Sequence, residues 1–159
     1  MSIEVRAASP QDAEEMAVLL NRIIAIGGTT AYRDLFDDTK IMSEFIAPEL
    51  AIACHIAVED QKICGFQALL WCDPTWPEEK RLPADWAIIG TYVDPEIHGK
   101  GIGRALFEST AAAARQAGVS FIDATIRREN TGGIAYYSRM GFEDYRSSDE
   151  AVSKRFAPA

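Results

Sequence analysis

The run from Val93 to Arg104, Val-Asp-Pro-Glu-Ile-His-Gly-Lys-Gly-Ile-Gly-Arg, limits the possible folds more than any other part of the sequence. The segment before it, 86–93, is apolar and β-prone, and Asp94-Pro95 ends it because proline cannot donate a ladder hydrogen bond. Apolar residues then recur at helical spacing over 102–117, and Gly118 is a typical helix stop. The sequence therefore predicts a strand, a glycine-rich loop and a helix in direct succession.

This loop has the composition of an anion-binding turn. Three alternating glycines allow backbone N–H groups to converge at the positive end of the helix dipole: Gly99, Gly101 and Gly103. Residues 97–107 include Lys100 and Arg104 and no carboxylate, although the chain carries a formal net charge of -8. The loop is therefore suited to a phosphate group.

Two familiar glycine motifs do not fit this loop. A dinucleotide fingerprint requires a third glycine where Arg104 stands, and the phosphate loop of NTPases requires Lys-Ser/Thr after its last glycine. The structural alternative to a phosphate-binding loop is a glycine turn that only lets the strand and the helix pack closely. The residues of the loop by themselves do not distinguish these two interpretations.

Length and composition favour one globular domain over residues 1–159. The chain is 48% hydrophobic and 25% charged, which is enough to build a sizeable core. A sequence pI near 4.8 argues against nucleic acid or an anionic membrane as the main partner, because those surfaces select basic patches. The N-terminus shows no long apolar stretch, so we expect no signal peptide and no membrane span.

Three cysteines fall in or beside apolar strands and are odd in number: Cys54, Cys64 and Cys72. We interpret them as buried small hydrophobes rather than a disulfide framework or metal ligands, and we expect a reducing, cytoplasmic setting with no metal.

The first half of the chain predicts a strand, two helices and a hairpin. Residues 3–7 alternate as a half-buried strand, and Ser9-Pro10 opens a helix that ends at Gly27-Gly28. A polar stretch follows, and a second helix is expected over about 39–46. Strands at 52–59 and 63–71 are joined by Asp60-Gln61. The proline-rich segment 72–84 that follows predicts either a lid or a plain surface loop.

The second half predicts a parallel strand pair and a closing hairpin. Residues 119–126 form a strand parallel to the one ending at Val93, because a long helix connects them. A helix starts at Asn130-Thr131 and ends at Gly141, and strands at 142–146 and 151–156 pair antiparallel. The whole is a mixed α/β layer, with helices on both faces of a mixed sheet.

Two motifs resemble signatures of one family. The first is Gln/Arg-x-x-Gly-x-Gly/Ala, matched by His98, Gly101 and Gly103, with His98 departing from Gln/Arg. The second is Asn-x₆-Tyr-x₃-Gly-Phe, matched by Asn130, Tyr137 and Gly141-Phe142. Together they are similar to the acyl-CoA signatures of the GCN5-related N-acetyltransferase (GNAT) family.

The resemblance implies a fold, a cofactor and a site. The central sheet is expected to splay at the strand ending near Val93, and acetyl-CoA, the acyl donor, is expected to pair with that strand edge. Its pyrophosphate is expected on the N–H groups of residues 99–104, including those of Lys100 and Ile102. A backbone N–H near Tyr92 or Val93 is expected to stabilise the oxyanion.

The resemblance also implies residue roles. Tyr137 is the candidate acid that protonates the departing thiolate, and Asn130 either holds the pantetheine arm or only caps its helix. The general base is left open, because residues 87–93 contain no Glu. Tyr92 or Asp85 acting through water and Asp123 on the next strand are the alternatives.

The expected activity is direct acetyl transfer to a small primary amine. Residues 21–31 faintly resemble amino-acid acetyltransferases that inactivate phosphinothricin, which makes an amino acid one acceptor to test. A protein or peptide N-acetyltransferase, a non-catalytic acyl-CoA-binding module and a plain nucleotide binder are the competing functions. A homodimer is compatible with each of them.

Overall fold

One mixed sheet runs through the computed structural model, which describes residues 2–97 and 99–159. Its strand order is β1-β2-β3-β4-β5-β7-β6, and every neighbouring pair is antiparallel except β4 and β5. The first four strands are β1 (Glu4–Ala7), β2 (Ala51–Glu59), β3 (Lys62–Trp71) and β4 (Trp86–Val93). The other three are β5 (Phe121–Arg127), β6 (Glu143–Ser147) and β7 (Ala151–Phe156).

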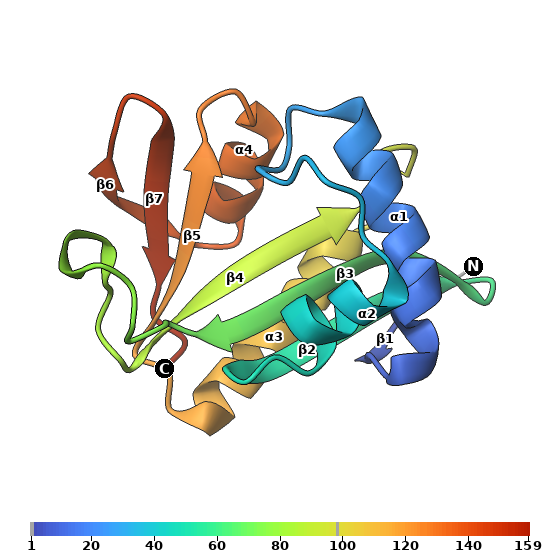
Figure 1. Ribbon diagram of the computed structural model, residues 1–159, viewed down its shortest axis with the longest axis horizontal. Coiled ribbons are helices and arrows are strands. Elements are labelled where there is room, and N and C mark those ends of the chain that lie inside the picture. The colour runs from blue at the N-terminus through green and yellow to red at the C-terminus, as the bar shows by residue number, and fades with distance from the viewer. Residues whose placement is uncertain (1, 98) are drawn as a thin grey trace.

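Helices cover both faces of this sheet (Figure 1). A short 3-10 turn, η1 (Pro10–Asp12), leads into α1 (Ala13–Ile26), which packs with α2 (Asp38–Ile41) and the π-helical turn η2 (Met42–Ile46) against one face. The other face holds α3 (Ile102–Ala117) and α4 (Thr131–Arg139). A last 3-10 turn, η3 (Glu78–Lys80), lies between β3 and β4.

Most predicted elements are present, and the mixed α/β fold is confirmed. The turn at Asp60-Gln61 joins Glu59 to Lys62, and both of its central residues have positive φ, as a tight two-residue hairpin requires. The helix expected over 39–46 is instead one α turn followed by a π turn. The Ala47 N–H donates to the Met42 carbonyl five residues back, and Pro48 then prevents further helix.

The two faces of the sheet have separate cores. Met16 and Leu20 of α1 and Phe66 of β3 are fully buried on one face, whereas Leu106 of α3 and Ile122 of β5 are fully buried on the other. The three cysteines are free and buried, as predicted, and burial raises the pKa of the Cys54 and Cys72 thiols to about 12. Within residues 2–97 and 99–159, no helix combines the length and the apolar character needed to cross a membrane.

A side chain of α1 is hydrogen-bonded to the connection between α1 and α2. The Asn21 amide donates to the Phe36 carbonyl at 2.9 Å and accepts from the Phe36 N–H at 2.8 Å. This pair satisfies both backbone groups of a residue whose ring is buried against Tyr32 and Phe45.

We predict that Asn21→Ala lowers the free energy of unfolding by about 1–3 kcal/mol, because it leaves the Phe36 N–H and carbonyl without their partner. Urea denaturation followed by circular dichroism measures the change. Asn21→Asp keeps the acceptor and loses the donor, so its loss should be smaller. An unchanged midpoint for Asn21→Ala would show that the pair does not contribute to stability.

Candidate active site

The parallel strands β4 and β5 pair over only three residues each. Trp86, Ala87 and Ile88 lie opposite Phe121, Ile122 and Asp123, and beyond Ile88 the two strands diverge (Figure 1). The sheet is therefore splayed along β4 as expected, but the opening begins after Ile88 and not at the strand end at Val93. On its other edge β4 stays paired with β3 as far as Val93.

Every second residue of β4 directs its backbone N–H and carbonyl groups into this gap. The Asp94 N–H donates to the Cys64 carbonyl of β3, and the Trp86 carbonyl accepts from the Cys72 N–H on the same side. Because successive residues of a strand direct their backbone groups to opposite edges, Tyr92 also faces β3, whereas Thr91 and Val93 face the gap. Of the two N–H groups named from the sequence, only that of Val93 is thus directed into the opening.

A cavity of about 690 Å³ fills the gap between the strands. Its walls include β4 and the loop after it, the far end of β5, the end of α1 and the connection that follows, and residues of α3 and α4. The side chains that matter below are Thr91, Thr125, Arg127, Asn130 and Tyr137. None of the described residues of 72–84 lines it, so that segment is a surface loop at the opposite end of β4 and not a lid.

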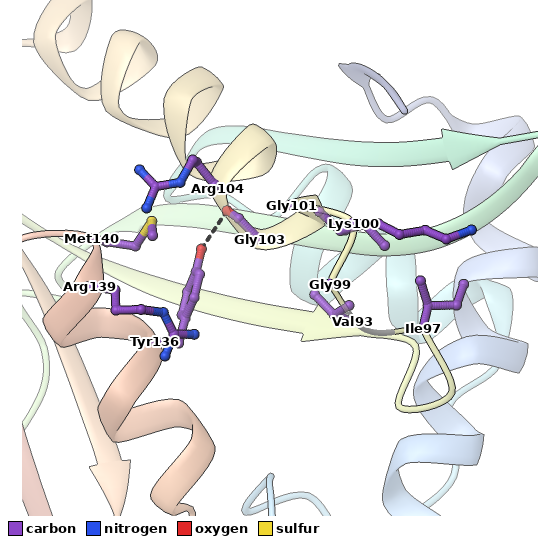
Figure 2. Close-up of a pocket in the computed structure, with 11 residues that line it drawn as sticks. Val93, Ile97, Gly99, Lys100, Gly101, Gly103, Arg104, Tyr136, Arg139 and Met140 are labelled. Carbon is purple, nitrogen blue, oxygen red and sulfur yellow. Dashed lines mark hydrogen bonds between the residues drawn. The ribbon is translucent and has the colours of Figure 1, made fainter. Parts of the chain in front are cut away.

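The glycine loop borders a second, adjoining cavity of about 290 Å³ at the start of α3 (Figure 2). Gly99 and Gly101 have φ of 71° and 72°, a left-handed backbone that favours glycine, and the first turn of α3 carries no acidic residue. The two cavities share Val93, Gly103 and Tyr136 in their walls, so they lie next to each other along the path from the gap to the glycine loop. His98, which the first motif includes, lies outside the described residues.

The charges beside the loop differ from the prediction. Lys100 is ion-paired with Glu59 at 3.0 Å, and Figure 2 shows its side chain extending away from Arg104. Arg104 lines the second cavity together with Arg139 of α4, and neither makes an ion pair within the described part of the chain. Arg139 was missed in the sequence because a basic residue in the last turn of a helix is expected on dipole grounds alone.

Gly103 is required for a different reason from the other two glycines. A Cβ built on it would lie 2.6 Å from Cε1 of Tyr136, whose ring covers the first turn of α3. The Tyr136 hydroxyl donates to the Gly103 carbonyl at 2.7 Å (Figure 2). This contact fixes α4 against the loop that precedes α3.

A hydrogen-bonded cluster joins the two tyrosines of α4 to the central strands. Gln67 on β3 donates to the hydroxyls of Thr91 at 2.9 Å and Tyr136 at 3.0 Å. Thr91 and Tyr137 share a hydrogen bond of 2.7 Å between their hydroxyl oxygens. Burial raises the pKa of Tyr136 to about 12 and that of Tyr137 well above its ordinary value. Both phenols are therefore protonated at neutral pH.

Three further residues named from the sequence are placed as follows. Asn130 caps α4, its side chain accepting from the Gly133 N–H at 2.9 Å, and its amide also donates to the Thr29 carbonyl. Tyr92 packs between Phe45 and Phe66, and burial raises its pKa well above the ordinary value. Asp123 is 5% exposed and does not line either cavity.

Asp94 anchors the start of the loop to α1. Its carboxylate is 6% exposed and accepts from Arg22 at 2.6 Å and from the Glu96 N–H at 3.0 Å. Asp94 lines the larger cavity, but this pairing satisfies its charge.

A sheet opened along β4, a glycine loop before α3 and a tyrosine-bearing α4 define an N-acetyltransferase type of fold. Residues 19–142 match the Acetyltransferase (GNAT) family, and the chain belongs to it. Over 85 residues, 52% of this chain, it is 38% identical to the uncharacterized N-acetyltransferase MJ1207 of Methanocaldococcus jannaschii. That match spans only 35% of the relative's own length.

Solved structures show the same fold. The structure of yncA of Salmonella typhimurium, provisionally assigned as an acetyltransferase and solved with its cofactor acetyl-CoA, has a TM-score of 0.83 at 16% identity, covering 100% of this chain and 95% of that one. A structure provisionally assigned as a phosphinothricin N-acetyltransferase has a TM-score of 0.80 at 17% identity, covering 99% of both chains. At these identities the likeness concerns the fold alone.

We predict that Gly103→Ala destabilises the protein by about 1–3 kcal/mol, because the added methyl group cannot share its place with the Tyr136 ring. Thermal unfolding monitored by circular dichroism measures it. Gly132→Ala in α4 is the matched control, since the nearest atom to its Cβ is 3.9 Å away and alanine is the better helix former. Equal effects of the two substitutions would contradict the packing argument.

Proposed function

We propose that the chain is an acetyl-CoA-dependent N-acetyltransferase that transfers an acetyl group directly to the primary amine of a small molecule. The observation that carries the proposal is the unpaired edge of β4, which opens onto a cavity next to the one that the glycine loop borders. A substrate that supplies an activated thioester at one end and phosphates at the other fits this path, because each part meets a matching group of the chain.

The glycine loop and two arginines match the phosphate end. Backbone N–H groups from Gly99 to Arg104 surround the smaller cavity at the start of α3, where the helix dipole favours negative charge. Arg104 and Arg139 add the positive charge that Lys100, paired with Glu59, does not direct there. In this proposal the loop binds through its backbone, so the departure at His98 removes no donor.

The gap-facing backbone of β4 matches the thioester end. The N–H and carbonyl groups of Thr91 and Val93 are free to pair with an extended amide chain, as a sheet edge pairs with an added strand. The N–H of Val93 or Thr91 then donates to the carbonyl oxygen as negative charge develops on it. One such donor contributes about 3 kcal/mol to the transition state.

Tyr137 is better placed than Tyr136 to protonate the leaving thiolate. The hydroxyl proton of Tyr136 is committed to the Gly103 carbonyl. The Thr91 hydroxyl accepts a hydrogen bond from Gln67, so its own proton can be donated to the Tyr137 oxygen. The phenol proton of Tyr137 is then free to point into the larger cavity, which Tyr137 lines. A thiolate whose thiol has a pKa of about 8.5 is a weaker base than the Tyr137 phenolate, so proton transfer from Tyr137 is uphill and its assistance is moderate.

A small acceptor that carries a carboxylate, such as an amino acid, suits the acceptor side of the cavity. The connection after α1 and the cap of α4 meet there through Asn130 and Thr29, which narrows the opening. Arg127 on β5 lines this side, and its ion-pair partner Glu129 is 52% exposed and therefore easily displaced by a buried anion. Release of free CoA with amino acids, amino-acid amides and short peptides tests the acceptor, and preference for a peptide would contradict it.

We predict that Gly101→Glu abolishes measurable acetyl-CoA binding in calorimetry, because it adds bulk and negative charge at the cavity wall. Gly118→Glu is the matched control, since Gly118 has the same left-handed backbone at the other end of α3 and lines neither cavity. Equal acetyl-CoA affinity in both variants would show that the loop is not the binding site.

We predict that Tyr137→Phe lowers kcat about 10²-fold and leaves the KM for acetyl-CoA little changed, because the lost proton is needed only as the thiolate departs. Steady-state CoA release measures both constants. Tyr136→Phe keeps the ring over Gly103 and loses only its hydroxyl, so it is the comparison. Full activity of Tyr137→Phe at every pH would reduce Tyr137 to a packing residue.

A further inference from the structure

A buried carboxylate lies where β4 and β5 separate. Asp123 is the last residue of β5 that pairs with β4, opposite Ile88, and it is 5% exposed. It accepts hydrogen bonds from the Tyr145 hydroxyl at 2.5 Å and from the Thr125 hydroxyl at 3.0 Å. No cation within the described part of the chain forms an ion pair with it. The carboxylate thus lies close to the gap and has no ion-pair partner among the described residues.

Thr125 connects this carboxylate to the cavity. It follows Asp123 by two residues on the same face of β5, and it is exposed where it lines the larger cavity. Gly90 and Tyr92 of β4 line the same cavity across the gap. Thr125 therefore places a hydroxyl at the vertex of the two strands, with Asp123 directly behind it.

The hydroxyl oxygen of Thr125 has one lone pair that can still accept a hydrogen bond. Its proton is donated to Asp123, and Ser153 of β7, 2.9 Å away, can donate to one of its lone pairs. A hydroxyl oxygen accepts two hydrogen bonds, so the second lone pair is available to an N–H group in the cavity. An amine that donates there would be linked to Asp123 through a single intervening atom.

Several titratable and charged groups face Asp123. Burial raises its pKa, while the hydrogen bonds from Tyr145 and Thr125 and the guanidinium of Arg146 act in the opposite direction. The Cys72 thiol faces the same carboxylate and is neutral, since its own pKa is raised to about 12. Arg155, opposite Asp123 on β7, places its guanidinium 4.4 Å from the centre of the Phe121 ring instead. A carboxyl group with a raised pKa is a stronger base than an exposed one.

The other candidate bases are less well placed. Asp85 is bonded to the Ser120 hydroxyl at 2.5 Å on the exposed surface and lines neither cavity. Asp94 is occupied by Arg22. Tyr92 has a raised pKa and remains a neutral phenol, which cannot accept a proton.

We propose that Thr125 and Asp123 form a proton relay that deprotonates the acceptor amine, an inference that rests on the proposed acetyltransferase activity. The ammonium group gives a proton to Oγ1 of Thr125 as the Thr125 hydroxyl proton moves to the Asp123 carboxylate. The products are a neutral amine, an intact threonine hydroxyl and a protonated Asp123, so protons and charge balance. Solvent later takes the proton from Asp123. In a separate step, Tyr137 protonates the departing thiolate.

The test compares pH profiles of kcat/KM for the best amine of the panel. We expect Asp123→Asn and Thr125→Val to lose about 10²-fold or more at neutral pH. The loss should shrink as the pH approaches the pKa of the amine, because a base is no longer needed once the amine is neutral. For a lysine-like amine of pKa about 10.4 the deficit should persist further up the pH scale than for an α-amine of pKa about 7.8.

Matched variants separate the relay from a structural role. Thr125→Ser keeps the hydroxyl and should retain most activity, and Asp85→Asn should behave as the unmodified protein because it lies outside the site. Acetyl-CoA affinity by calorimetry should be unchanged in Asp123→Asn and Thr125→Val. If Asp123→Asn does not fold, the pair Thr125→Val and Thr125→Ser still decides the question.

Three outcomes would overturn the relay. Full activity of Thr125→Val and Asp123→Asn at every pH would show that no proton passes through them. The same fractional loss at every pH would assign them a structural role only. If the unmodified protein binds acetyl-CoA but acetylates no amine of the panel, the proposed acetyltransferase function is wrong, and the relay is wrong with it. If the unmodified protein is active and both variants are equally active, only the relay is wrong.

Discussion

Hydrogen bonds from one short helix hold the two halves of the sheet together where their strands no longer pair. Beyond Ile88, β4 and β5 share no ladder, and α4 makes the connection with Tyr137 to Thr91 of β4 and Tyr136 to Gln67 of β3. The same Tyr136 fixes α4 to the first turn of α3. The gap can therefore stay open as a cavity because side chains of α4, rather than backbone pairing, maintain the spacing. The glycine loop, the β4 edge and the acceptor side all depend on that spacing.

The sequence was most informative where neighbouring residues determine the conformation of the backbone. Residues that act on their immediate neighbours determine several features that the sequence predicts. These features are the end of β4 at Asp94-Pro95, the glycine loop, the two ends of α3 and the hairpin at Asp60-Gln61. The start of the gap was less predictable, because it is set by contacts between α4 and β4 that are distant in sequence. For the same reason the pairing of Lys100 with Glu59 and the role of Arg139 were not foreseen. Thr91 did leave a signal, as a hydroxyl within an otherwise apolar strand.

Two buried carboxylates bear on the proposed proton relay, since β4 carries no glutamate. Asp94 and Asp123 are similarly buried but differ in their partners. Arg22 forms an ion pair with Asp94, whereas among the described residues Asp123 receives hydrogen bonds only from neutral hydroxyl groups, and burial raises its pKa. Burial without an ion-pair partner increases the basicity of a carboxylate. Asp94 therefore secures the loop, and Asp123 is the residue that we propose as the base.

The contact between Gly103 and Tyr136 also restricts how this chain can change over evolutionary time. The ring of Tyr136 occupies the space that any side chain at position 103 would need. The family motif accepts alanine as well as glycine at that position, so a lineage can adopt alanine only after a smaller residue has replaced the ring, or together with that change. Alanine at position 103 and an aromatic residue at position 136 should consequently be mutually exclusive among descendants of this sequence. A substitution that is harmless in one relative would then be deleterious in another, depending on which of the two sites changed first.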